Sequence, residues 1–302
     1  MKNYTRTLVR DIKAAARIGH IESLWVAIDS LAQIPEVKGN HPLNETFLNQ
    51  VILPTAQALS GPRVSKPALQ PLLNSSLTAI RAVGSSALAL RFLKKVNHTT
   101  LKDLRIIAKE PRKEVREAVV LACEQIAPDH PDKLTELVNG WLGQDSPRLQ
   151  GIAIRLLPNL PLPQAIKKLS SLSDASLPKD PEIRAALART VNTIGRRGAA
   201  EEVIRILRLW VDTPEDYFWV ITRCLAKGWA ADYPQEAMEI LTILAEEKGP
   251  KKKIRDTLQA FSHNVAAALV RETILSWMNA EHPNLRAAGE DAYQALIEPE
   301  EN

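Results

Sequence analysis

The chain has 302 residues, 45% hydrophobic and only 5% aromatic, with a formal net charge of +4 at pH 7. No apolar run approaches the roughly 18 residues of a membrane-spanning helix, so we expect no membrane partner. The basic N-terminal segment lacks the apolar core of about 7–15 residues that marks a signal peptide. Cys123 and Cys224 lie on apolar helix faces and are expected to be buried free thiols. We therefore expect a cytoplasmic protein.

The N-terminal third has the least regular pattern. Apolar spacing predicts helices at 3–17, 20–34, 43–60, 66–83, 85–97 and 99–109. Gly, Asn and Pro residues predict loops at 39–45 and 60–67. Pro54 lies inside an apolar run and is expected to kink or split that helix. This part is either a set of degenerate repeats or an N-terminal cap.

From residue 112 onward, a pattern of two helices recurs. The segment EVREAVVLACEQI is followed 34 residues later by RLQGIAIRLLPNL, and after another 34 residues by EIRAALARTVNTI. Val115, Leu149 and Ile183 thus occupy the same slot, and looser copies follow near 219, 254 and 285. Second helices are predicted between these copies, at 132–143, 162–172, 199–211, 235–247 and 265–279.

A period of this length with two helices per unit is typical of an α-solenoid. The sequence therefore predicts an all-α fold of HEAT-like antiparallel helix pairs wound into a right-handed superhelix. We expect one domain over 1–302, irregular at 1–111 and regular at 112–298. Arg116 and Arg184 follow the shared apolar slot, so both are expected to bond carbonyl groups or an acidic residue of a neighbouring repeat. Alternatively, both line the concave surface and bind the partner.

Basic residues concentrate in the N-terminal part. Residues 1–116 hold 18 Lys and Arg against 8 Asp and Glu, whereas residues 117–302 hold 21 against 27. The densest part, 81–116, holds ten basic and three acidic residues. This asymmetry favours an acidic partner, although a solvated helical face is the alternative. The predicted contact residues of this part are Arg91, Lys94, Lys95, Arg105, Lys109, Arg112 and Lys113.

Two further features suggest partner contacts. Lys251, Lys252 and Lys253 begin a predicted helix, where cations oppose the helix dipole. Tyr217, Phe218 and Trp219 are consecutive, and side chains about 100° apart on a helix cannot all face one core stripe. We therefore expect Phe218 and Trp219 to contribute to partner binding, with core packing as the alternative.

Catalytic motifs are missing from the sequence. It contains no GxxxxGK[ST], GxGxxG, HExxH or CxxC pattern, and its six histidines do not cluster. We therefore predict no catalytic residues, no metal site, no cofactor and no enzymatic activity.

The segment VREAVVLACEQIAPDHPDKLTELVNGWLG at 115–143 resembles the HEAT-like repeats of bacterial DNA-alkylation-repair proteins of the AlkC/AlkD type. The segment YFWVITRCLAKGWAADYPQEAMEIL at 217–241 has the same character, and the resemblance extends over about 112–298. It implies the fold of a glycosylase that holds damaged DNA in a basic concave groove with aromatic residues and an essential Asp. The part of the chain that carries this resemblance is net acidic, so only the fold is carried over.

These observations together predict a non-catalytic HEAT-repeat interaction scaffold that binds a macromolecule along its concave face. The alternative is a nucleic-acid-binding protein related to the alkylation-repair proteins, contacting phosphates with 81–116. In either case the partner, protein or nucleic acid, presents an acidic surface. The sequence leaves the oligomeric state open.

Overall fold

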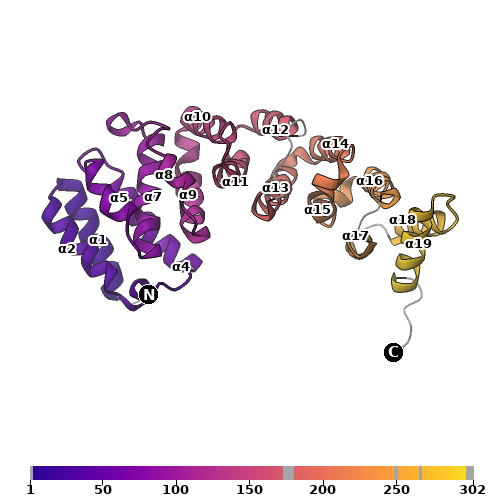
Figure 1. Ribbon diagram of the computed structural model, residues 1–302, viewed down its shortest axis with the longest axis horizontal. Helices are drawn as coiled ribbons and strands as arrows, with labels where there is room; N and C mark the ends of the chain where they lie inside the picture. The colour runs from indigo at the N-terminus through magenta and orange to yellow at the C-terminus, as the bar shows by residue number, and fades with distance from the viewer. Residues whose placement is uncertain (1–2, 173–179, 248–250, 265–266, 297–302) are drawn as a thin grey trace. The chain divides into compact units, whose positions relative to one another are not determined.

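The computed structural model describes residues 3–172, 180–247, 251–264 and 267–296, and these residues form α-helices joined by short turns, 3₁₀ segments and π segments (Figure 1). No β-strand occurs within those ranges, which confirms the all-α prediction. The chain divides into two compact units, residues 1–160 and residues 161–302. Whether the whole chain behaves as one domain stays a prediction.

Unit 1 opens with helices whose bounds the apolar pattern predicts well, α1 (Asn3–Ile18) and α2 (Ile21–Ala32). The short α3 (Pro35–Lys38) and α4 (Glu45–Phe47) follow. The predicted helix at 43–60 is not split, because residues 45–59 form one helical run in which a π segment (Leu48–Ile52) joins α4 to α5 (Leu53–Leu59) with helical backbone angles at both ends. Pro54 lies two residues after this π segment. The expected disturbance at Pro54 therefore takes the form of a π segment and not of a break in the helix.

The remaining helices of unit 1 are α6 (Gln70–Leu73), α7 (Thr78–Leu93), α8 (Arg105–Ala108), α9 (Lys113–Ile126), α10 (Pro131–Leu142) and α11 (Pro147–Leu156). The predicted break at residue 84 is wrong, since α7 runs through it. A Cβ atom on Gly84 would lie 2.8 Å from Leu72 Cβ, so glycine allows α6 and α7 to approach closely here. The helix predicted at 99–109 is reduced to turns and α8.

Helix α7 is the centre of unit 1. Nearly every residue along it is buried, because α5, α6 and α9 pack around it. A helix that is buried on all sides has no amphipathic stripe. This explains why periodicity in the sequence failed to predict its bounds.

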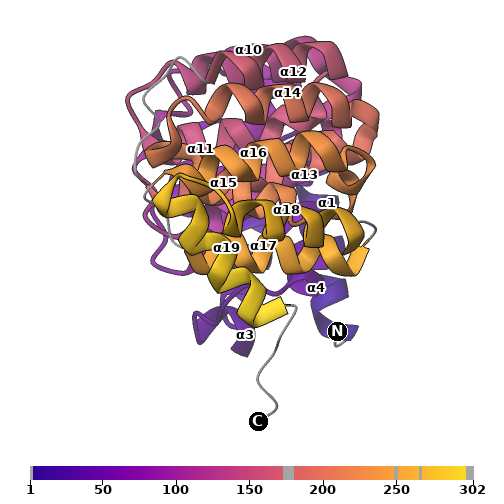
Figure 2. The same ribbon diagram turned by 90° about the vertical axis from the view of Figure 1, so that its right-hand side faces the viewer.

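Unit 2 repeats one arrangement. Its helices are α12 (Leu162–Ser171), α13 (Pro181–Ile194), α14 (Ala200–Trp210), α15 (Pro214–Leu225), α16 (Pro234–Glu246), α17 (Lys251–Asn264), α18 (Ala267–Met278) and α19 (Pro283–Leu296). In chain order, α13, α15, α17 and α19 contact one another in one layer, and α12, α14, α16 and α18 form the other (Figures 1 and 2). Paired packing of this kind is what the recurring sequence pattern predicts.

One hydrogen bond recurs between helix pairs. In each case the side chain that follows the first buried apolar residue of a helix donates to the backbone carbonyl six residues earlier. The donor–acceptor distances are 2.8–3.1 Å, and the pairs are Arg81 to Ser75, Arg116 to Glu110, Gln150 to Gln144 and Arg286 to Ala280. The predicted carbonyl bond of Arg116 is thus confirmed. For Arg184 the corresponding position, 178, lies outside the described residues. Since Arg81 makes the same bond, the repeat pattern reaches back to α7, before residue 112.

Candidate functional site

The basic residues of 81–116 separate into an inward and an outward set. Arg91 on α7 is fully buried, and its Nη1 donates to the carbonyl oxygens of Gly61 (3.0 Å) and Val64 (2.6 Å). Desolvation by burial lowers the pKa of this guanidinium. A side chain with no exposed surface cannot contact a partner. The prediction that Arg91 belongs to the contact surface is therefore wrong.

Two other predicted contact residues are only half exposed. Lys94 donates from Nζ to Ser60 Oγ over 2.8 Å, and desolvation lowers its pKa. Arg112 has a buried Nη1 with no hydrogen-bond partner in the described part of the chain. Lys95 and Lys113 are exposed. Their role as partner contacts stays a prediction.

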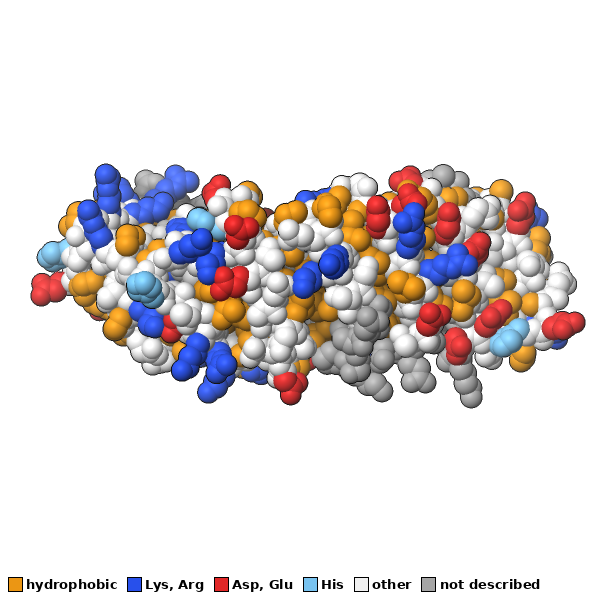
Figure 3. Space-filling view, turned by 90° about the horizontal axis from the view of Figure 1, so that it is seen from above, with side chains coloured by type: hydrophobic (Ala, Val, Ile, Leu, Met, Phe, Trp, Pro, Cys, Tyr) orange, Lys and Arg blue, Asp and Glu red, His pale blue; other side chains and the backbone are white. Residues whose placement is uncertain are grey.

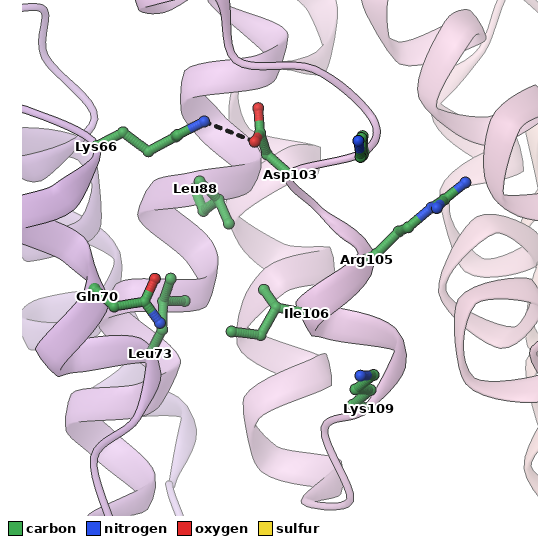
Figure 4. A pocket seen from close by; sticks show the side chains of 9 residues that line it. Lys66, Gln70, Leu73, Leu88, Asp103, Arg105, Ile106 and Lys109 are labelled. Carbon is green, nitrogen blue, oxygen red and sulfur yellow. Dashed lines mark hydrogen bonds and ion pairs between the residues drawn. The ribbon is translucent and has the colours of Figure 1, made fainter.

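The two remaining predicted residues of this stretch, Arg105 and Lys109, lie at an open cleft of about 320 Å³ in unit 1 (Figure 4). The loop at 60–67, α6, α7 and the segment 101–109 form its walls. The cleft is lined by Lys66, Gln70, Leu73, Leu88, Lys102, Asp103, Arg105, Ile106 and Lys109. Leu73, Leu88 and Ile106 give it an apolar floor, and in Figure 4 the charged side chains lie above this floor (Lys66 and Asp103) and to its right (Arg105 and Lys109).

One ion pair closes one end of the cleft. Lys66 Nζ lies 2.7 Å from Asp103 Oδ1, and Asp103 Oδ2 accepts hydrogen bonds from the backbone N–H of Thr100 (2.8 Å) and from its hydroxyl (3.1 Å). Burial raises the pKa of Asp103, but the hydrogen bonds from Lys66 and Thr100 outweigh that effect and hold the pKa below its usual value. Asp103 is thus ionised at neutral pH and neutralises Lys66.

The other cations of the cleft are not neutralised in this way. Lys102, Arg105 and Lys109 are exposed and make no ion pair with any residue that the structure describes. In Figure 4, Ile106 points toward Leu73, whereas Arg105 extends away from Lys66. On the face drawn in Figure 3, Lys and Arg side chains outnumber acidic ones over unit 1, at the left. The cleft therefore combines an apolar floor with uncompensated positive charge.

The sequence did not single out Lys66 and Lys102. Lys102 belonged to the basic stretch, and Lys66 lies at the end of the predicted 60–67 loop, where that loop overlaps the helix predicted at 66–83. Its approach to Asp103, 37 residues away, depends on how that loop folds over α7. The apolar floor also combines three separate segments, so no local motif could have identified it.

In unit 2 the aromatic run is divided between core and surface. Tyr217 is buried, donates from its hydroxyl to the carbonyl of Leu172 (2.6 Å) and stacks on Trp210 with ring centroids 4.5 Å apart. Phe218 and Trp219 are partly exposed, so the expectation that the three rings cannot share one core face is confirmed. Lys251, Lys252 and Lys253 are exposed at the start of α17, where the sequence placed them.

Across the described ranges, no group of three or more His, Cys, Asp and Glu side chains is arranged to hold a metal ion. None of the helices described is long and apolar enough to cross a membrane. Cys123 and Cys224 are buried free thiols, and burial raises the pKa of both.

No protein-family model matches the sequence, and the search of curated proteins finds no match. Two crystal structures of engineered proteins from the Northeast Structural Genomics Consortium each align with 97% of this chain. One shares 16% identity over 88% of its own length with a TM-score of 0.34. The other shares 18% over 96% with a TM-score of 0.24. The helix pairs themselves define the chain as an all-helical repeat protein.

Proposed function

We propose that this protein is a non-catalytic, HEAT-like interaction protein that binds an acidic, partly apolar segment of a partner protein in the cleft of unit 1. The observation that carries this proposal is the set of three exposed cations, Lys102, Arg105 and Lys109, around an apolar floor. We place the protein in the cytoplasm, because its two cysteines are buried free thiols.

The lining of the cleft favours a peptide over a nucleic acid. A peptide with alternating acidic and apolar side chains would bury the apolar ones against Leu73, Leu88 and Ile106 and bring its carboxylates to the surrounding cations. No aromatic side chain lines the cleft, so it has no platform on which bases stack. Nucleic acid, the alternative drawn from the alkylation-repair proteins, would use the cations but not the apolar floor.

The cations and the floor make different contributions. Exposed cations attract an acidic segment over a distance of about one Debye length, roughly 8 Å at physiological ionic strength, and mainly raise the rate of encounter. The apolar floor contributes affinity that salt does not screen. Arg105 adds a planar fork of donors that matches a carboxylate. Binding is therefore expected to weaken with salt without being lost.

Fluorescence anisotropy with labelled peptides tests the proposal. A short peptide alternating Glu and Leu is expected to bind more tightly than one alternating Glu and Ser. The variant K102Q/R105Q/K109Q is expected to weaken binding of the Glu–Leu peptide on the order of tenfold. The control variant R6Q/K13Q/K38Q removes three exposed cations of unit 1 that neither line the cleft nor belong to the predicted contact residues, and its affinity is expected to remain within about twofold of wild type.

Three results would contradict the proposal. If neither peptide binds, or if both triple variants weaken binding equally, the cleft is not a peptide site. If a single-stranded oligonucleotide binds more tightly than the Glu–Leu peptide and only K102Q/R105Q/K109Q loses it, the nucleic-acid alternative is correct. The steepness of the salt dependence separates the two, since binding to phosphates falls steeply as salt rises.

A further inference from the structure

A second recess lies in unit 2, between α15 and α17, with a volume of about 240 Å³. Its lining residues are Trp219, Thr222, Arg223, Ala226, Lys227, Lys253, Asp256 and Thr257. Trp219 belongs to the aromatic run 217–219, and Lys253 belongs to the lysine run 251–253. The packing of α15 against α17 brings them to one place.

The hydroxyl groups of the recess are already occupied. Thr222 Oγ1 donates to the carbonyl of Phe218 (3.0 Å), and Thr257 Oγ1 donates to the carbonyl of Lys253 (2.8 Å) and approaches that of Thr222 (3.3 Å). Both threonines are buried. They tie α15 to α17 and form a fixed floor, so a ligand would have to be held by the charged side chains.

The charged side chains leave an excess of positive charge. Arg223, Lys227 and Lys253 are exposed and make no ion pair within the described part of the chain, and Asp256 is the one carboxylate among the lining residues. Three cations and one carboxylate give a net charge of two positive units. The guanidinium carbon of Arg223 lies 4.9 Å from the ring centroid of Trp219, a cation–π contact that positions the Arg223 side chain.

We propose that this recess binds the phosphoryl group of a phosphomonoester. Such a group carries about −1.5 to −2 charges at pH 7 and three acceptor oxygens, which matches the net charge of the lining. The guanidinium of Arg223 offers paired donors to these oxygens, and Lys227 and Lys253 act as point charges. The volume is below the roughly 300–1,000 Å³ of sites for drug-sized ligands, which suits a single phosphoryl group.

Two other occupants fit the recess less well. A carboxylate carries one negative charge and would leave half of the excess positive charge uncompensated. A stacked nucleic-acid base needs an open aromatic face, but the guanidinium of Arg223 lies over the ring of Trp219. The recess shares no residue with the cleft of unit 1, so this inference is independent of the proposed function.

Phosphorus NMR titration of the full chain tests the inference. Inorganic phosphate, O-phosphoserine and a short peptide containing phosphoserine are the probes, and at least one is expected to show a saturable shift. The variants R223Q and K253Q are each expected to weaken this binding on the order of tenfold. R223K keeps the charge but loses the planar fork and is expected to lie between R223Q and wild type. Circular dichroism spectra and melting temperatures check that each variant folds.

Lys252 supplies the matched control. It is adjacent to Lys253 on the same helix and is also exposed, but it does not line the recess. K252Q is therefore expected to bind the phosphate probes like wild type. The probe that binds most tightly shows whether the phosphoryl group that the recess recognises is free phosphate or is attached to an amino acid or a peptide.

The inference is overturned if no probe gives a saturable shift, or if K252Q weakens binding as much as K253Q does. It is also overturned if an oligonucleotide without terminal phosphates displaces the probe more effectively than phosphoserine does. That result would assign the recess to phosphodiesters.

Discussion

Within the basic stretch 81–116, two groups of cations with the same charge do different things. Arg91 and Arg116 turn inward and donate to backbone carbonyls, whereas Lys102, Arg105 and Lys109 remain exposed and form no ion pair with a described residue. The difference follows from the surroundings of each residue. Arg91 and Arg116 are buried beside turns whose carbonyl groups lack helical partners, and buried carbonyls require donors.

The largest expected effect comes from Arg91. R91A leaves the carbonyls of Gly61 and Val64 without their donor and opens a cavity beside α7. We expect a loss of about 3–4 kcal/mol in the free energy of unfolding, measured by urea denaturation. R91M fills the space and removes the desolvated charge, so it is expected to recover part of that loss. If R91A lowers the free energy of unfolding by no more than about 0.5 kcal/mol, as a substitution of an exposed lysine would, Arg91 does not hold the 60–67 loop.

Arg116 is expected to give the next largest effect. R116A removes the donor to the carbonyl of Glu110. A hydrogen bond from a charged group contributes about 1.5–3 kcal/mol to the free energy of unfolding, so we expect a loss of that size. Gln150 makes the equivalent bond in the next repeat, so R116Q is expected to retain most of the stability. Arg184 occupies the same slot, and R184A is expected to lower the melting temperature as well. Equal losses from R116A and R116Q would exclude the carbonyl bond as the cause.

The sequence predicted the features that depend on local spacing. The bounds of the second helices and the carbonyl bond of Arg116 follow from periodicity or from one residue's chemistry. It did not predict the long α7, because a helix buried on every side shows no stripe. The sequence did not predict the cleft, because the ion pair between Lys66 and Asp103 depends on the fold of the 60–67 loop. Arg91 holds that loop through the Val64 carbonyl, but the sequence pattern had assigned Arg91 to the surface.

The exposed cations of the cleft are expected to behave in the opposite way to Arg91. K102Q/R105Q/K109Q should shift the melting temperature by no more than about 2 °C, because substitutions at exposed sites rarely change stability. The same variant is expected to lose affinity for the Glu–Leu peptide on the order of tenfold, and most of that difference should disappear in high salt. A large drop in melting temperature would mean that these residues also stabilise unit 1.

Asp103 is expected to give the smallest effect, and it connects the two groups. Because the folded-state pKa of Asp103 is held below its ordinary value of 3.8, its ionised form stabilises the fold above that pH. This contribution is lost as the pH falls through the folded pKa. D103N is therefore expected to flatten the decline of stability in acid, measured by urea unfolding between about pH 2 and 5.

At neutral pH, D103N also releases Lys66 from its ion pair, while an Asn oxygen can still accept the hydrogen bond from the Thr100 backbone. The cleft then has four uncompensated cations around an unchanged floor. We expect the affinity for the Glu–Leu peptide to rise about two- to threefold, consistent with one exposed ion pair. K66Q/D103N removes the released cation and is expected to return the affinity to the wild-type value. If D103N instead weakens binding of the Glu–Leu peptide, Asp103 serves mainly to fix the positions of Lys66 and Thr100, and its negative charge does not reduce the affinity for the peptide.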